Sequence, residues 1–162
     1  LFLMLSATVT QMIMNSYESA LAIMPQLAGF VPMLTGTGGN CGSQSSTLVI
    51  RGLAVGEIEF RDLLKVIWKE IRIAVCISIV LAVVNGLRIM LMGQGDALMA
   101  FTIGLTMACT VVIAKVVGCT LPLIAKRVGL DPAIMATPLI STLVDISTIS
   151  VYFAIVSAVF QL

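Results

Sequence analysis

A long apolar run indicates the class of this protein. Residues 97–121 read ALMAFTIGLTMACTVVIAKVVGCTL, in which Lys115 is the single charged side chain. About 20 mostly apolar residues in a helix cross the ~30 Å hydrocarbon core of a membrane. The run does not alternate polar and apolar residues, as a transmembrane β-strand does. The sequence therefore predicts an all-α integral membrane protein.

The composition excludes several other classes. Of the 162 residues, 59% are hydrophobic and 10% are charged, whereas a soluble domain is about 25% charged. The formal net charge of +1 gives no reason to expect binding of nucleic acid. The sequence contains no His, which removes histidine-based catalysis and the commonest metal-binding side chain.

Four further apolar segments bring the expected number of transmembrane helices to five per chain. Together they form a single transmembrane domain, residues 1–162. Residue 1 already stands inside an apolar run, so we expect further chain ahead of it. The expected spans are about 1–22, 25–50 (interrupted by Pro32, Gly36, Gly38 and Gly39), 71–91, 97–121 and 133–162.

Basic residues predict the orientation of these spans. Cytoplasmic loops of membrane proteins carry the excess of Lys and Arg. Arg88 is the only such residue near the loops on the opposite side, where it can snorkel to the interface. The N-terminus is therefore expected in the cytoplasm and the C-terminus outside. The seven loop cations that decide this are Arg51, Arg61, Lys65, Lys69, Arg72, Lys126 and Arg127.

The loop between the second and third spans has a helical pattern of its own. In residues 57–71 apolar side chains recur at helical spacing with charged residues between them, and Trp68 suits the headgroup level. This pattern predicts an interfacial amphipathic helix on the inner leaflet. The alternative is a helical extension of the third span into the cytoplasm.

One carboxylate stands near the middle of the last span. A carboxylate at mid-bilayer costs about 2.5–3.5 kcal/mol on insertion scales, so Asp145 must face protein or water. Steps of three and four residues place five polar side chains on one helix face, namely Thr137, Ser141, Asp145, Thr148 and Tyr152. We interpret this stripe as the lining of an ion path. The alternative is a hydrogen-bonded seam between helices.

A structural ion pair between Lys115 and Asp145 is an alternative to the ion path. Lys115 lies about six residues from the cytoplasmic end of the fourth span, so its side chain can snorkel to that end. We prefer this interpretation to a buried Asp145–Lys115 pair. It predicts that Lys115→Met leaves transport largely intact.

The second span carries an uncharged polar face. Residues 35–47 read TGTGGNCGSQSST, and Asn40, Ser43 or Gln44, and Thr47 follow one another at helical spacing. The glycines permit close helix packing or exposed backbone carbonyls. Packing explains some of the glycines, but Asn40 and Gln44 still need polar partners.

These oxygen-bearing groups suit a hard divalent cation. Carboxylate, amide, hydroxyl and water oxygens are ligands for Mg²⁺, Ca²⁺ or Mn²⁺. The four cysteines are far apart in sequence, which makes a thiolate zinc site improbable. One Asp145 per chain supplies a single negative charge, and two chains about a twofold axis supply two. We therefore expect a homodimer with the ion path near its axis, between spans two and five.

Two motifs resemble the MgtE family of magnesium transporters. The run from Pro32 to Thr47, with Arg51 and Leu53-Ala54 after it, is similar to that family's second span. Gly129-Leu130-Asp131-Pro132-Ala133 and Pro138-Leu139-Ile140, followed by Thr142-Leu143 and Asp145, are similar to its fifth span.

The resemblance implies a function and several site residues. Members of this family are homodimers in the bacterial plasma membrane that conduct Mg²⁺ inward. The family's central pore aspartate, where hydrated Mg²⁺ binds, matches Asp145. Its cytoplasmic-loop aspartate, which joins the Mg²⁺-sensing contacts, matches Asp131. Asn40 and Thr47 match polar positions of the second span.

This sequence also departs from the family pattern. Ser43 and Thr137 stand where members carry or are expected to carry Asn, and both keep an oxygen but lose amide reach. The family's N-terminal cytoplasmic domain, paired CBS domains and connecting helix fall outside this chain. Feedback closure by intracellular Mg²⁺ is therefore not expected of the chain in its usual form.

Two alternatives to a channel-like importer were weighed. A Na⁺-coupled Mg²⁺ carrier would need a second cation site, for which Glu18 is the candidate; otherwise Glu18 lies solvated at the outer mouth. An intramembrane serine protease would need a His, which this sequence lacks. An aspartyl protease would need a second acid beside Asp145, which only a dimer could supply. We therefore expect that the protein is not an enzyme.

Overall fold

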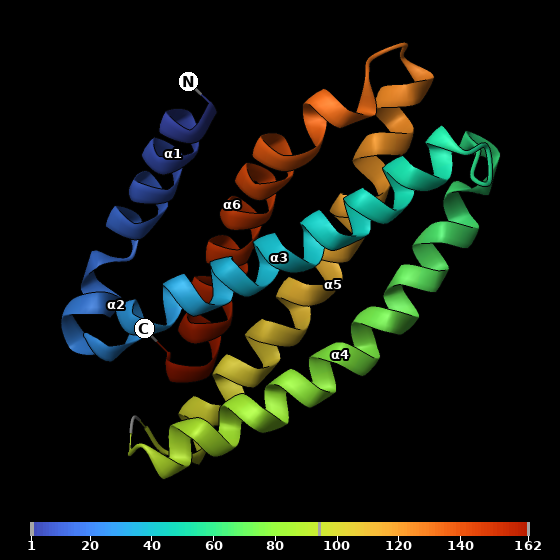
Figure 1. Ribbon diagram of the computed structural model, residues 1–162. Helices are drawn as coiled ribbons and strands as arrows, with labels where there is room; N and C mark the ends of the chain where they lie inside the picture. The colour runs from blue at the N-terminus through green and yellow to red at the C-terminus, as the bar shows by residue number, and fades with distance from the viewer. Residues whose placement is uncertain (1, 94, 162) are drawn as a thin grey trace.

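Helices follow one another along the whole described chain, and residues 2–93 and 95–161 contain no strand. The computed structural model describes these residues, with their side chains except at residues 2, 3, 5, 6 and 134–137. This confirms the all-α prediction. The elements are α1 (Phe2–Ser16), α2 (Glu18–Ile23), α3 (Gln26–Ala54), the short 3₁₀ helix η1 (Phe60–Asp62), α4 (Leu63–Leu91), α5 (Ala97–Arg127) and α6 (Pro132–Phe160) (Figure 1).

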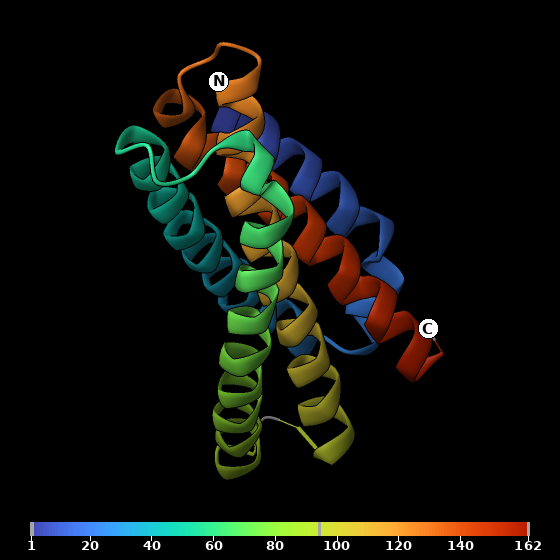
Figure 2. The ribbon, with the colours of Figure 1, turned by 90° about the vertical axis from the view of Figure 1, so that its right-hand side faces the viewer.

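Helix α5 is the centre of the bundle. It packs against α3, α4 and α6, while α3 also packs against α6, and α1 lies against α6 (Figures 1 and 2). The buried Thr102 and Thr106 hydroxyls of α5 donate to the carbonyls of Leu98 and Thr102, at 2.8 and 2.9 Å. Such bonds to the preceding turn let hydroxyl residues lie in an apolar interior without an unpaired donor.

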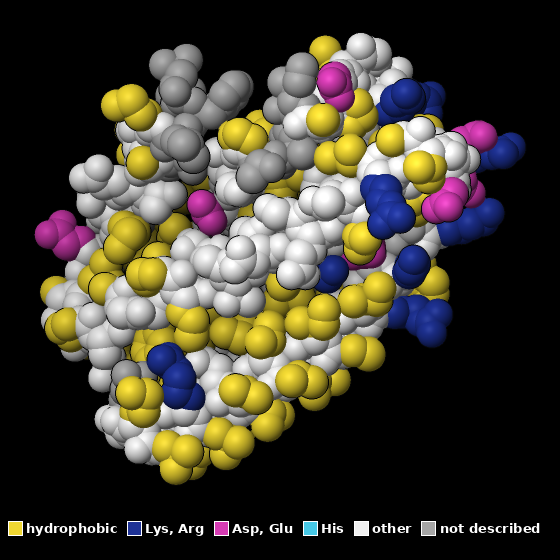
Figure 3. Space-filling model, viewed as in Figure 1, with side chains coloured by type: hydrophobic (Ala, Val, Ile, Leu, Met, Phe, Trp, Pro, Cys, Tyr) yellow, Lys and Arg dark blue, Asp and Glu magenta, His cyan; other side chains and the backbone are white. Residues whose placement is uncertain are grey.

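The basic residues gather at one end of the bundle. Figure 3 shows Lys and Arg side chains concentrated where α3 leads into α4. The guanidinium of Arg127, at the end of α5, lies 4.2 Å from the ring centre of Phe60 in η1, which is a cation–π contact. The two basic loops therefore meet at the same end, as the orientation argument requires.

Within the part of the chain that the structure describes, three helices are long and apolar enough to cross a membrane: Phe60–Leu91, Ala97–Arg127 and Pro138–Phe160. The span expected at 1–22 is wrong as a single helix, because the chain breaks at Tyr17. Helix α1 covers Phe2–Ser16, and the separate helix α2 follows from Glu18. The full count of five spans stays a prediction.

The expected interruption of the second span is also wrong. Helix α3 continues through Pro32 and the glycines to Ala54. Gly38 and Gly42 sit where an added Cβ would meet Val144 and Ile140 of α6 at 2.8 and 3.0 Å. These glycines therefore allow close helix packing, and they do not unwind the helix.

The separate amphipathic helix between spans two and three is not observed. Residues 60–62 form η1, and from Leu63 a single helix runs to Leu91, so the alternative of a helical extension is confirmed. The apolar side of this segment, including Leu63 and Val66, packs against Val49 and Leu123. Protein contacts therefore cover part of the apolar stripe that we assigned to the lipid surface, while Leu64 and Trp68 stay exposed.

Candidate cation groove

The two faces of α3 have different surroundings. One face is buried against neighbouring helices and holds Gly38, Cys41, Ser45 and Val49 among its residues. The other is open and polar, and includes Asn40, Gln44 and Thr47. Steps of three and four residues separate the members of each set, because a helix makes one turn in 3.6 residues. The sequence pattern for this helix therefore separates packing positions from open ones.

Asp145 faces a groove between α3 and α6. The groove has a volume of about 440 Å³, and Ser141 and Asp145 of α6 line it together with Asn40 and Ser43 of α3. Gly36 and Gly39 also line it, and nothing lies within 4 Å of the place where their Cβ atoms would be. Two predicted polar faces, distant in sequence, thus meet at one groove.

A second groove continues along α3. Its volume is about 580 Å³, and it is lined by Asn40, Ser43, Gln44, Thr47 and Leu48. Asn40 and Ser43 belong to both grooves. The Thr47 hydroxyl donates to the Ser43 carbonyl at 2.8 Å. The predicted α3 residues therefore form a continuous polar surface beside Asp145.

The C-terminal part of the α6 stripe, Thr148 and Tyr152, is buried inside the bundle. Thr148 is 1% exposed, and its Oγ1 lies 3.2 Å from the Cβ position of Gly38. The buried Tyr152 hydroxyl donates to the Leu27 carbonyl at 2.9 Å. These two residues lie in the α3–α6 contact and not on the groove. For Tyr152 the alternative of a hydrogen-bonded seam is the observed one.

Asp145 has no basic partner among the side chains that the structure describes. The salt bridges among the described side chains are Arg61–Glu59, Lys65–Asp62 and Lys115–Glu70. Those side chains also include no cluster of three Asp, Glu or Cys that could hold a metal ion. One chain therefore presents a single carboxylate at the groove. A cation there would be bound by this carboxylate together with neutral oxygens and water.

Lys115 corrects our prediction that its side chain snorkels to the cytoplasm. It is 3% exposed, and its Nζ lies 3.1 Å from Oε2 of Glu70. Nor does it pair with Asp145. The sequence analysis missed Glu70 because it lies among nine charges between residues 51 and 72. A signal was present, since Glu70 follows Leu63 and Val66 and precedes Ala74 at helical spacing on the buried side.

The remaining predicted site residues lie elsewhere. Asp131 is exposed and caps α6, accepting a hydrogen bond from the Ala133 amide at 2.9 Å. Glu18 is exposed at the start of α2. The Thr137 side chain lies outside the described residues. Neither Asp131 nor Glu18 lines the Asp145 groove.

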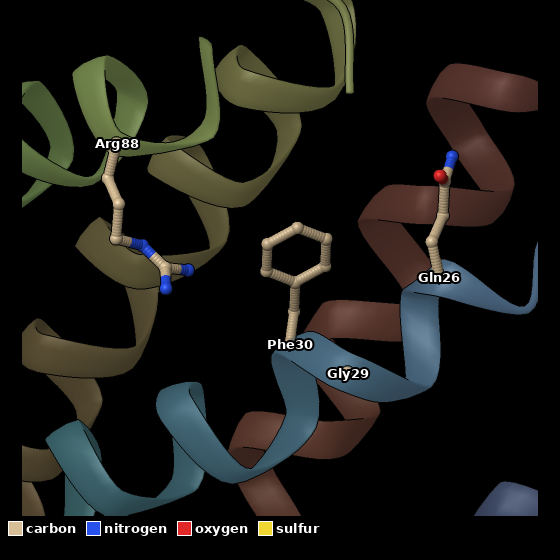
Figure 4. Close-up of a pocket in the computed structure, with 4 residues that line it drawn as sticks. All are labelled: Gln26, Gly29, Phe30 and Arg88. Carbon is tan, nitrogen blue, oxygen red and sulfur yellow. The ribbon is translucent and has the colours of Figure 1, made fainter. Parts of the chain in front are cut away.

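Arg88 lines a different pocket. This pocket, of about 250 Å³, is bounded by Gln26, Gly29, Phe30 and Arg88. Figure 4 shows the Arg88 side chain extending from α4 toward the side of Phe30 on α3. Its Nε donates to Asn85 Oδ1 at 3.2 Å. A fixed guanidinium repels cations, so this pocket does not belong to the cation groove.

The fold and the groove define a multi-pass helical membrane protein with an acid on a polar surface between two helices. Residues 31–155 match the family MgtE, described as divalent cation transporter. The chain belongs to this family.

Curated relatives agree with this assignment. The magnesium transporter MgtE of Thermus thermophilus is 35% identical over 157 residues, which cover 94% of this chain and 34% of the relative. The magnesium transporter MgtE of Bacillus subtilis is 36% identical over 146 residues, covering 90% and 32%. That of Enterococcus faecalis is 33% identical over 151 residues, covering 91% and 32%. The chain thus spans about a third of the length of these relatives.

Proposed function

We propose that this chain moves divalent cations, chiefly Mg²⁺, across the plasma membrane through a channel-like pore that includes the α3–α6 groove. The observation that carries the proposal is Asp145, which has no basic partner among the described side chains and shares the groove with Ser141, Asn40 and Ser43. Mg²⁺ releases its water reluctantly. A wide groove with one fixed charge therefore suits a hydrated ion, and Mn²⁺ or Ca²⁺ can occupy it as well.

A second copy of the chain completes this pore. An open polar surface cannot face lipid without cost, because lipid offers it no hydrogen bonds. Two chains related by a twofold axis would cover each other's grooves and bring two Asp145 carboxylates to one path. Their combined charge of −2 matches one divalent cation. Gln44, Thr47 and, on α6, Thr137 are the other residues assigned to the pore wall, whereas the buried Thr148 is left out of it.

The orientation follows from the basic end of the bundle. In a bacterial inner membrane this end faces the cytoplasm. Residues 1–162 then form a transmembrane domain with a cytoplasmic N-terminus and five crossings, and the regulatory domains of the full-length protein precede it. Asp131 lies at the cytoplasmic end, where it can join a second Mg²⁺ contact.

Removal of the groove carboxylate tests the function. In proteoliposomes, Asp145→Asn is expected to lower Mg²⁺ uptake at least ~10-fold, the effect of about 1.4 kcal/mol of lost cation stabilisation. Asp96→Asn is the matched control, because Asp96 caps α5 by accepting from the Met99 amide at 2.9 Å and lies outside the groove. Normal uptake by Asp145→Asn would exclude the assigned site.

A change of counter-cation distinguishes the channel from the Na⁺-coupled carrier. A channel keeps its Mg²⁺ flux when Na⁺ is replaced by choline. A flux that falls with Na⁺, and falls again in Glu18→Gln, would instead support coupled exchange.

A further inference from the structure

A buried polar triad lies on the face of α3 that points away from the cation groove. Ser45 of α3, Glu70 of α4 and Lys115 of α5 form it, with exposed fractions of 0%, 4% and 3%. Lys115 Nζ donates to Glu70 Oε2 and to Ser45 Oγ, both at 3.1 Å. The Ser45 hydroxyl in turn donates to Glu70 Oε2. Helices α3, α4 and α5 therefore meet at one buried ion pair.

A close backbone contact lies one helical turn from the triad. A Cβ added to Gly118 of α5 would fall 2.2 Å from the Gly42 carbonyl oxygen of α3. Gly42 precedes Ser45 by three residues, and Gly118 follows Lys115 by three. Because the two backbones touch here, the short Ser45 side chain can reach the Lys115 ammonium group.

The part of this α3 face beside the triad consists of small residues, among them Gly42 and Ser46, while the larger Phe30, Leu34 and Val49 pack farther along it. Apolar contacts of either kind have no preferred direction. Hydrogen bonds to a buried ion pair are directional and lose much of their strength when bent. Beside the groove, the triad is thus the directional contact that defines the rotation of α3, whereas the hydrogen bond from Tyr152 to Leu27 lies at the start of the helix.

We propose that Glu70 and Lys115 are positioning residues, which act through Ser45 to fix the rotation of α3 and hold Asn40, Ser43 and Gln44 on the cation path. The inference rests on the proposed function of the groove. Side-chain tips lie about 5–6 Å from a helix axis, so a rotation of about 10° moves them ~1 Å. A displacement of about 1 Å in a positioned group can cost up to two orders of magnitude in rate.

Two neighbouring serines provide a matched test. Both are buried on α3, but the Ser46 hydroxyl has no partner among the described residues, whereas Ser45 bonds the ion pair. In the full chain in lipid vesicles, Ser45→Ala is expected to lower Mg²⁺ uptake about 5–10-fold and to change the Mg²⁺/Ca²⁺ uptake ratio. Ser46→Ala is expected to stay within about twofold of the parent for both.

Thiol labelling reports the rotation without depending on transport. In a background that keeps one cysteine at a time, a water-soluble maleimide should label Asn40→Cys quickly and the native Cys41 slowly, because position 40 is exposed and Cys41 is 7% exposed. Ser45→Ala should bring the two labelling rates at least about threefold closer, whereas a mere loss of stability would leave this ratio unchanged in the folded protein.

A double variant covers the case in which Ser45→Ala does not fold. Glu70→Gln with Lys115→Met removes both charges and leaves no uncompensated ion, and it should shift the labelling ratio in the same direction. An unchanged ratio and unchanged uptake selectivity in either folded variant would overturn the positioning role. Failure of the proposed function gives a different result. In that case Asp145→Asn shows normal Mg²⁺ uptake, while Ser45→Ala still alters the labelling ratio.

Discussion

Two acids lie within the helical bundle and have opposite surroundings. Glu70 is almost fully buried, with a lysine and a serine on one of its oxygens. Asp145 is only partly buried and has no basic partner among the described side chains. A carboxylate in an apolar medium must be paired, protonated or hydrated. Glu70 is paired, so its charge serves the structure, and Asp145 is open, so its charge is free for a cation.

The largest expected effect breaks the internal pair. Lys115→Met leaves the Glu70 charge buried and uncompensated, which should lower the free energy of unfolding by about 3–5 kcal/mol. Asp145→Asn, which breaks no ion pair, should change it by less than about 0.5 kcal/mol. Thermal unfolding in detergent without Mg²⁺ compares the two variants. Equal losses would mean that the two acids do not differ as described.

The next effect concerns the backbone contact beside the triad. Gly118→Ala places a methyl group against the Gly42 carbonyl and should cost about 1–3 kcal/mol through overpacking. Gly86→Ala on α4 is the control, because nothing lies within 4 Å of its Cβ position. The same unfolding measurement is used. A Gly118→Ala protein as stable as Gly86→Ala would show that α3 and α5 separate without cost.

A smaller effect is expected at Tyr152, in the C-terminal part of α6. Tyr152→Phe removes the hydrogen bond to the Leu27 carbonyl and should destabilise the protein by about 0.5–1.5 kcal/mol, the net contribution of a typical hydrogen bond. Tyr17→Phe is the comparison, because the Tyr17 ring stacks on Phe153 with centroids 4.6 Å apart and its packing is kept. If both variants lose the same stability, the hydroxyl of Tyr152 has no special role.

The smallest effect on stability is expected at Gly39, which lines the Asp145 groove. Gly39→Ala enters open space in a helix, where Ala is favoured over Gly by up to about 1 kcal/mol. Stability should therefore rise slightly. The added methyl narrows the groove, so Mg²⁺ uptake should fall by about twofold to threefold, far less than in Asp145→Asn. A loss of stability would contradict the open surroundings of Gly39.

Much of the fold could be predicted from apolar length alone. Helices α4, α5 and α6 appear near the expected ranges, because long apolar segments must pair their own backbone groups in lipid. The N-terminal segment could not be predicted as well. The helix breaks at Tyr17, among the polar residues Ser16, Glu18 and Ser19, and the stacking of Tyr17 on Phe153 is a contact between distant segments.

The candidate site was predictable in part. The spacing of Ser141 and Asp145, and of Asn40 and Ser43, predicted which side chains share a helix face. Their common groove depends on how α3 and α6 pack. The same packing turns Thr148 inward, because Gly38 lets the two helices approach beside it.

The sequence by itself determined the class of the protein, most of the helical segments and the place of Asp145 inside an apolar span, since local composition fixes the cost of placing each segment in lipid. Only the tertiary structure decided that Glu70, and not Asp145, forms an ion pair with Lys115. Lys115 could snorkel, pair with Asp145 or pair with Glu70 as far as spacing could tell. The contact of Gly42 with Gly118 brings α3 beside α5, and the resulting triad pairs the buried Lys115 charge with Glu70.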